Sequence, residues 1–114
     1  VMVVTSGEMM SLYAAGNIMH AIENFQKRGY ARFRGLVANL RAIEDEEAKI
    51  AQFCAEEGAF VAATIPRSPL VQRAEDERAG AVEAFPSSDV AVAYRALAQT
   101  VEAAARETAT GAMR

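Results

Sequence analysis

The sequence lacks several of the residues on which assignments of function most often rest. It contains no tryptophan, one histidine and one cysteine, Cys54, so an internal disulfide is excluded. A lone thiol is typical of a reducing compartment, and we therefore expect a cytoplasmic location. Cys54 cannot hold an iron–sulfur cluster by itself, because such clusters take about four thiolates.

Phosphate-binding motifs are also missing. Neither GxxxxGK[ST] nor GxGxxG occurs, so no segment is predicted to cradle a phosphate group. No apolar run approaches the roughly 20 residues of a spanning helix, which argues against a membrane protein. The net charge of −3 and the pI near 5.2 argue against a nucleic-acid surface. One basic cluster, made of Lys27, Arg28, Arg32 and Arg34, is more typical of a solvated turn than of a polyanion site.

What remains is the composition of an ordinary globular protein. The 114 residues are 52% hydrophobic and 24% charged, which suits about one small soluble domain. The chain begins with Val1 rather than methionine, and its first residues already have the character of a strand. We therefore expect it to be a piece of a longer protein.

Three apolar segments predict buried β-strands, namely Val1 to Val4, Arg32 to Leu40 and Ala59 to Ile65. Pro66 ends the third strand, because proline cannot donate a hydrogen bond to a sheet. Helical patterns lie between and after the strands. Their order predicts an α/β fold, in which a parallel sheet is flanked by helices joined through right-handed crossovers.

The predicted helices carry recognisable boundary signals. Thr5 and Glu8 have the spacing of a capping box, and an apolar stripe follows them at Met10, Ala14, Ile18, Ala21 and Phe25. A second helix follows the charged residues 44–49 and ends at Gly58. Ser68 and Pro69 predict the start of a third helix, and residues 87–89 cap a last one. No pattern continues after Thr108, so residues 109–114 are predicted to fray.

Ligands of parallel α/β sheets bind beyond the carboxyl ends of the strands. Residues 5–8, 39–41 and 66–68 occupy that edge here. Asn39 and Gln72 carry amides that can donate and accept hydrogen bonds, and Tyr94 offers a flat ring, which together suit a planar base. The alternative is that Asn39 caps a turn and Tyr94 packs in the core, and the residue types alone favour this plainer interpretation.

Other reactive side chains are expected to be structural. His20 is an isolated imidazole on a helix, and Cys54 lies in a helical stripe where it suits the core. The acidic runs 44–47 and 75–77 are interpreted as solvated helix faces. No catalytic and no metal-ligating residue is therefore predicted in this chain.

Four blocks of the sequence resemble the nitrogenase iron protein family. They are VTSGEMMSLYAAGNI (Val4 to Ile18), LVANLR (Leu36 to Arg41), IPRSPLVQRAE (Ile65 to Glu75) and AYRALA (Ala93 to Ala98). The blocks lie in family order, and the resemblance covers about residues 1 to 105. It implies that residues 1–108 are the C-terminal, base-binding half of a P-loop NTPase domain.

The resemblance also implies an activity. Members are homodimeric, ATP-hydrolysing oxidoreductases that use Mg²⁺ with ATP or ADP and pass electrons from a shared [4Fe-4S] cluster to a partner such as nitrogenase. The cluster cysteines and the phosphate loop would precede Val1, so this chain alone is expected to be inactive. By resemblance, Glu8 and Met10 face the dimer interface, and the adenine pocket is lined by Asn39, Ile65, Pro66, Arg67, Val71, Gln72 and Tyr94.

Several departures from the family pattern suggest a divergent relative, and one of them, at Val90, suggests a looser pocket. Ala38 replaces a cysteine, Ser68 replaces an aspartate, and Val90 stands where a glutamine usually reaches the base. Two other functions stay open. One is a partition- or Min-type ATPase of the same superfamily without a redox role, and the other is a stand-alone interaction module without an ATP site.

Overall fold

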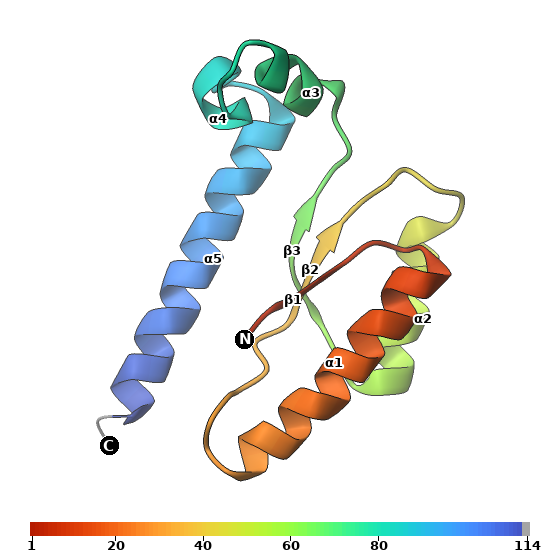
Figure 1. Ribbon diagram of the computed structural model, residues 1–114, viewed down its shortest axis with the longest axis vertical. Coiled ribbons are helices and arrows are strands. Elements are labelled where there is room, and N and C mark those ends of the chain that lie inside the picture. Colours follow the sequence, from red (N-terminus) through yellow and green to blue (C-terminus); the bar gives the residue numbers. More distant parts are fainter. Residues whose placement is uncertain (113–114) are drawn as a thin grey trace. The chain divides into compact units, whose positions relative to one another are not determined.

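The computed structural model describes residues 1–112 of the chain (Figure 1). These residues divide into two compact units, Val1–Arg67 and the part that starts at Ser68. The first unit contains β1 (Val3–Thr5), α1 (Met9–Lys27), β2 (Leu36–Asn39), α2 (Glu46–Glu57) and β3 (Val61–Ile65). The second contains α3 (Pro69–Asp76), α4 (Ala81–Ala84) and α5 (Asp89–Ala112).

The first unit is a parallel β-sheet with helices against it. The strands are ordered β1-β2-β3, and both neighbouring pairs are parallel. The predicted α/β fold with a parallel sheet is confirmed. Strands β2 and β3 lie within their predicted segments and are shorter than predicted. Strand β1 is also shorter than predicted, and it ends one residue later.

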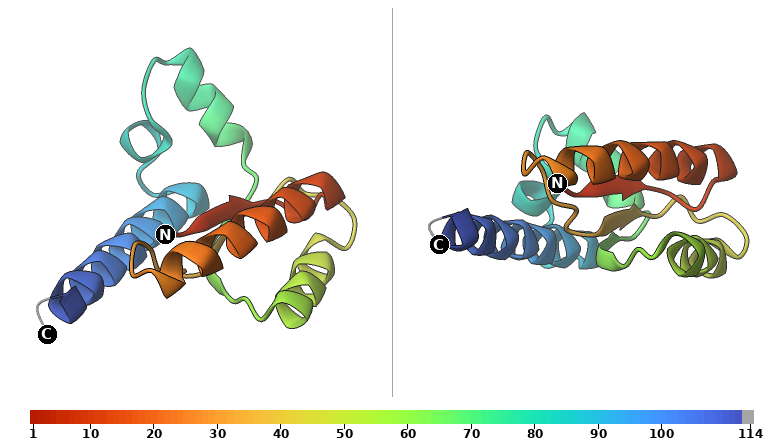
Figure 2. Two further views of the ribbon diagram at one scale, coloured as in Figure 1. Left: turned by 60° about the horizontal axis from the view of Figure 1, so that its bottom comes forward. Right: turned by 90° about the horizontal axis from the view of Figure 1, so that it is seen from below.

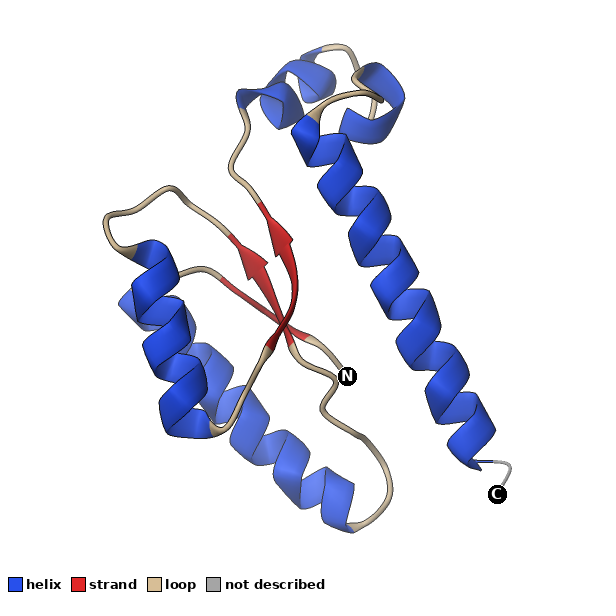
Figure 3. Cartoon of the chain, turned by 180° about the vertical axis from the view of Figure 1, so that it is seen from behind, coloured by secondary structure: helices blue, strands red, loops and turns tan. Residues whose placement is uncertain are grey.

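Both helices of the first unit lie on one side of the sheet (Figures 1 and 3). This is the arrangement that two successive right-handed crossovers produce. The hydrophobic core lies between helices and sheet and consists of Val3, Ala15, Met19, Ile22 and Leu36. Phe53 and Cys54 of α2 pack against this cluster, so both helices share one core.

Helix α1 buries a different face from the one that the apolar stripe predicted. Met10, Ile18 and Phe25 are 78%, 49% and 50% exposed. The buried face is instead formed by Ala15, Gly16, Met19 and Ile22. The prediction was wrong because the helix carries two apolar stripes, and the local pattern does not say which of them packs against the sheet and α2. Phe53 of α2 lies beside Gly16, and a Cβ atom there would be at an ordinary contact distance of 3.6 Å from its ring.

The predicted capping box was also wrong. Helix α1 begins at Met9, and its N-cap residue Glu8 makes no side-chain capping hydrogen bond. Thr5 instead belongs to β1, where its hydroxyl lies 2.9 Å from the Ser11 hydroxyl oxygen. The strand thus continues through the residue that the local pattern assigned to the cap.

The second unit is helical. The Ser68 hydroxyl accepts a hydrogen bond from the Leu70 N–H at 3.2 Å, and Pro69 occupies the first turn, so this predicted helix start is confirmed. The Ser88 hydroxyl likewise accepts from the Ala91 N–H at 3.2 Å. Short helix α4 was not predicted; it packs against both α3 and α5 (Figure 2).

Helix α5 continues through Ala112, beyond Thr108 where the sequence pattern ends. The predicted frayed tail over residues 109–114 therefore overlaps the helix, and residues 113 and 114 lie outside the described part of the chain. Among the described residues, no helix has both the length and the apolar character needed to cross a membrane.

Candidate functional site

A polar hollow lies at the carboxyl edge of the sheet in the first unit. Its walls come from the end of β1, the turn into α1 and the loop after β2. The lining residues are Val4, Thr5, Ser6, Glu8, Met10, Ser11, Asn39 and Arg41. This is the edge at which the parallel fold predicts a ligand, and it carries hydroxyl, amide, carboxylate and guanidinium groups together.

Asn39 stands at the rim of this hollow. It is the last residue of β2, it is exposed, and it pairs with Ile65, the last residue of β3. The Leu40 N–H donates a hydrogen bond to the Ile65 carbonyl at 2.9 Å, so the two chain segments leave the sheet side by side. Asn39 and the segment 65–67 are thus neighbours at one edge.

The remaining predicted base contacts lie in the second unit. Val71 and Gln72 belong to α3, where Gln72 is exposed, and Tyr94 belongs to α5. Tyr94 is 37% exposed. Its ring is therefore available to solvent rather than enclosed in a core. That these side chains meet Asn39 around one base stays a prediction.

Glu46 is the polar residue that the sequence analysis missed. It was assigned to a solvated helix face, yet it is only 5% exposed. Its carboxylate accepts hydrogen bonds from the backbone N–H groups of Gly7 at 2.9 Å, Arg41 at 3.0 Å and Ala42 at 2.9 Å. A signal was present: Ile50, which is buried, lies one turn later, and residues four apart share a helix face.

The Glu46 carboxylate is charged although it is buried. Burial raises the pKa of Glu46, but hydrogen bonds from the surrounding backbone lower it by more, so the net pKa falls below its ordinary value. The backbone groups responsible are those of Gly7, Arg41, Ala42 and Ile43. The negative charge is thus balanced by peptide dipoles.

The loop between β2 and α2 has an unusual backbone. Ala42 and Asp45 adopt φ angles of 58° and 54°, in the left-handed region that non-glycine residues seldom occupy. Such conformations cost on the order of 1 kcal/mol each and persist where other contacts impose them. For Ala42 the imposing contact is the hydrogen bond from its N–H to Glu46.

A second, weaker interaction also joins the loop after β2 to the turn before α1. The Arg41 guanidinium lies 3.4 Å from the Glu8 carboxylate, and the two side chains are 58% and 49% exposed. Exposed ion pairs contribute little stability because water and salt screen them. The buried Glu46 contact is therefore the main connection between the two loops.

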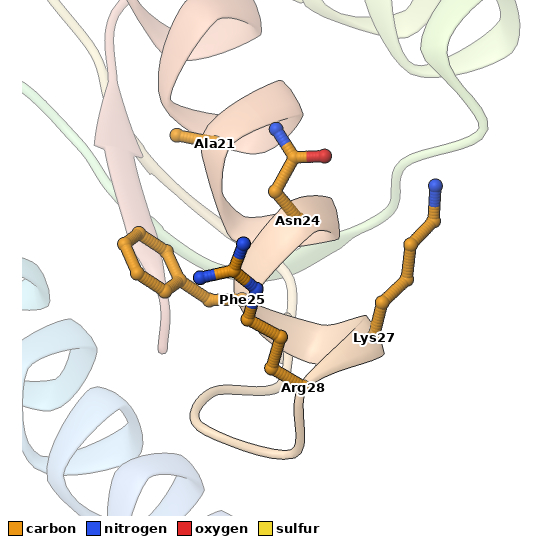
Figure 4. Close-up of a pocket in the computed structure, with 5 residues that line it drawn as sticks. All are labelled: Ala21, Asn24, Phe25, Lys27 and Arg28. Carbon is orange, nitrogen blue, oxygen red and sulfur yellow. The ribbon is translucent and has the colours of Figure 1, made fainter.

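Another hollow lies at the far end of α1 and is lined by Ala21, Asn24, Phe25, Lys27 and Arg28 (Figure 4). Its polar side chains do not converge, since Lys27 and Asn24 leave the helix on a different side from Phe25. It also lies away from the carboxyl edge of the strands. The hollow at Asn39 is therefore the better candidate site.

Comparison with known proteins decides the family. Residues 1–113 match the family described as "4Fe-4S iron sulfur cluster binding proteins, NifH/frxC family". The chain belongs to this family. It is 42% identical over 100 residues to the nitrogenase iron protein of Methanospirillum hungatei, and 40% identical over 101 residues to nitrogenase iron protein 2 of Methanothermobacter thermautotrophicus. These matches cover 86% and 89% of this chain but only 36% and 37% of the relatives.

Solved structures of similar fold come from cell-division ATPases. The MinD protein of Pyrococcus furiosus matches 89% of this chain and 42% of its own chain, with a TM-score of 0.65 and 23% identity. MinD of Pyrococcus horikoshii, solved with Mg-ADP, matches 94% of this chain and 43% of its own, with a TM-score of 0.68 and 21% identity. At this level of identity the likeness establishes the fold.

The residues of this NifH/frxC family member do not by themselves fit a [4Fe-4S] cluster. The sequence offers one thiol, whereas such clusters take about four. Cys54 is partly buried against the core, and burial raises the pKa of its thiol. In the described residues, no three His, Cys, Asp or Glu side chains gather as metal ligands. His20 is paired with Glu57 at 3.1 Å on the surface.

Proposed function

We propose that this chain supplies the base-binding half of an ATP-dependent iron–sulfur reductase similar to the nitrogenase iron proteins. The observation that carries the proposal is the position of Asn39, exposed at a polar hollow on the ligand-binding edge of a NifH/frxC family sheet. A carboxamide can donate one hydrogen bond and accept another, which is what the edge of adenine requires.

The other base contacts in the proposal are assigned by resemblance to the family. The segment Ile65, Pro66 and Arg67 leaves the sheet beside Asn39 and offers backbone groups to the base edge. Val71 and Gln72 would contact the base from the start of α3, and Tyr94 would offer its ring. In this proposal the chain binds and orients the base.

The proposal assigns the remaining chemistry to sequence outside this chain. Cysteines there would hold the [4Fe-4S] cluster, which supplies electrons when bound, and a phosphate loop there would hold Mg²⁺ and the ATP phosphates. The whole protein would act as a cytoplasmic homodimer that reduces a partner protein, nitrogenase being one such acceptor. What supports this is the 40–42% identity to nitrogenase iron proteins.

A second candidate is a Min-type ATPase with no redox role. The likeness of fold to two MinD proteins, one of them described as a cell-division ATPase and the other solved with Mg-ADP, favours it. The two candidates share the base site and differ in the cluster. Iron and sulfide analysis of the intact protein that carries this chain separates them: stoichiometric iron supports the reductase, and a nucleotide-binding protein without iron supports the Min-type ATPase.

The base site itself is tested by nucleotide titration of that intact protein. Replacing Asn39 with alanine should weaken binding of ATP and ADP by about 1 kcal/mol, roughly fivefold, because one base-edge hydrogen bond is lost. His20→Ala is the control, since His20 is exposed and paired with Glu57, and should leave the affinity unchanged. If Asn39→Ala binds as the parent does, the base site is wrongly placed; no binding by the parent favours an interaction module.

A further inference from the structure

We infer that Glu46 is a positioning residue for the proposed base site. Its carboxylate joins the loop that follows Asn39 to the turn before α1, so that occupancy of the base site is transmitted to the start of α1. The inference rests on the proposed function, because it requires a base to bind at Asn39. The predicted site does not include Glu46.

The geometry of the carboxylate supports this role. One oxygen of Glu46 accepts from the Gly7 N–H at 2.9 Å, and the other accepts from the Ala42 N–H at 2.9 Å. The Arg41 N–H lies 3.0 Å from both oxygens. Arg41 is two residues from Asn39 in sequence. A single buried side chain thus fixes the separation between the two segments.

There is little free space in this contact. A Cβ atom at Gly7 would lie 2.3 Å from Cγ of Glu46 and 3.1 Å from its Cα. The turn therefore lies directly against the first residue of α2. Because the packing is this close, a shift of the loop at Arg41 and Ala42 would have to move the turn at Gly7 or break the hydrogen bonds.

The joined segments are also the walls of the candidate hollow. Ser6 and Glu8 line one side, and Asn39 and Arg41 line the other. Glu46 accepts hydrogen bonds from Gly7, which lies between Ser6 and Glu8, and from Arg41, and so sets the distance between the two walls. The width of the hollow, and with it the approach of a base to Asn39, therefore depends on a residue that does not line the hollow.

The contacts continue from the turn into α1. The Ser11 hydroxyl accepts from the Ser6 N–H at 3.0 Å, which connects the turn to the first helical residues. On the outer side of these residues Met9, Met10 and Tyr13 are 82%, 78% and 68% exposed. A chain of direct contacts thus leads from the base loop to an exposed apolar surface, and packed, hydrogen-bonded contacts of this kind can carry energetic coupling between two sites.

Amide hydrogen exchange, with and without Mg-ATP, tests the inference on the intact protein that carries this chain. In the parent, Mg-ATP should slow exchange several-fold in residues 39–42 and also in residues 7–13. Glu46→Gln keeps the size of the side chain but turns an N–H₂ group toward the backbone donors. In this variant the slowing of exchange should persist in residues 39–42 and be lost in residues 7–13. Glu47→Gln, the matched control, changes the exposed neighbour of Glu46 on the same helix and should retain both effects.

The possible outcomes separate failure of the coupling from failure of the base site. If Glu46→Gln retains the Mg-ATP effect in residues 7–13, the coupling through Glu46 is wrong while the base site stands. If Mg-ATP changes neither segment of the parent, the base site and the coupling both fail. The parent alone overturns the inference if Mg-ATP protects residues 39–42 but not residues 7–13.

Discussion

At the scale of single residues, Glu46 is a buried carboxylate with no cationic partner among the described residues. Removing such a charge from water costs several kcal/mol, even after the protein relaxes. Three backbone N–H groups donate to it, and hydrogen bonds to charged groups contribute about 1.5–3 kcal/mol each, so the two terms are of similar size. Glu46 is therefore tolerated as long as all its donors stay in place.

We expect the stability of the protein to depend on the ionisation of Glu46. The pKa of Glu46 in the folded state lies below its ordinary value of 4.5, so its contribution is present above pH 4.5 and is lost as pH falls through the lower, folded pKa. Glu46→Gln should lower the free energy of unfolding by on the order of 2 kcal/mol at pH 7. On acidification, the free energy of unfolding should fall less in Glu46→Gln than in the parent. Urea denaturation at pH 7 and below pH 4.5 measures both effects.

Glu47→Gln provides the comparison, because Glu47 is the next residue on the same helix and is exposed. It should change the unfolding free energy at pH 7 by less than about 0.5 kcal/mol, as surface substitutions usually do. Equal acid sensitivity in the parent and in Glu46→Gln would contradict the role given to the buried charge.

At the scale of elements, α1 contains a glycine whose position does not require one. Gly16 lies in the middle of the helix, and a Cβ atom there would lie 3.6 Å from the Phe53 ring, an ordinary contact distance. Gly16→Ala should therefore raise the free energy of unfolding by about 0.5–1 kcal/mol, because alanine loses less backbone entropy in a helix. Thermal or urea denaturation measures the change.

Gly29→Ala is the opposite case. Nothing lies within 4 Å of a Cβ atom at Gly29, but its φ angle is 76°, which glycine adopts without strain and alanine does not. This variant should be destabilised by about 1 kcal/mol or more through the backbone alone. If both alanine variants shift stability in the same direction, helix propensity does not govern position 16.

The elements also show what the sequence could predict. The three strands and their parallel pairing followed from apolar runs separated by helices, and the start of α3 followed from Ser68 and Pro69. The buried face of α1 did not, because two apolar stripes compete and only contact with α2 selects between them. Glu46 was missed for a similar reason: an acidic run is usually solvated, and only the packing of its turn against Gly7 buries it.

At the scale of the whole molecule, the residues that family resemblance assigns to the base site are spread over both compact units of the chain. Asn39 and residues 65–67 belong to the first, and Gln72 and Tyr94 belong to the second. Neighbouring parallel strands place the first group at one edge, which topology alone could predict. Assigning the second group relied on resemblance to a family, since no spacing rule connects α3 and α5 to a base.

The 114-residue chain by itself provides a test of the proposal that cluster and phosphate binding belong to sequence outside it. It should neither hydrolyse ATP nor retain a [4Fe-4S] cluster, because it has no phosphate-loop motif and one partly buried thiol whose pKa is raised by burial. Phosphate release, together with iron and sulfide content after anaerobic reconstitution, measures both activities. Steady phosphate release or stoichiometric iron and sulfide would show that the chain is more than a base-binding half.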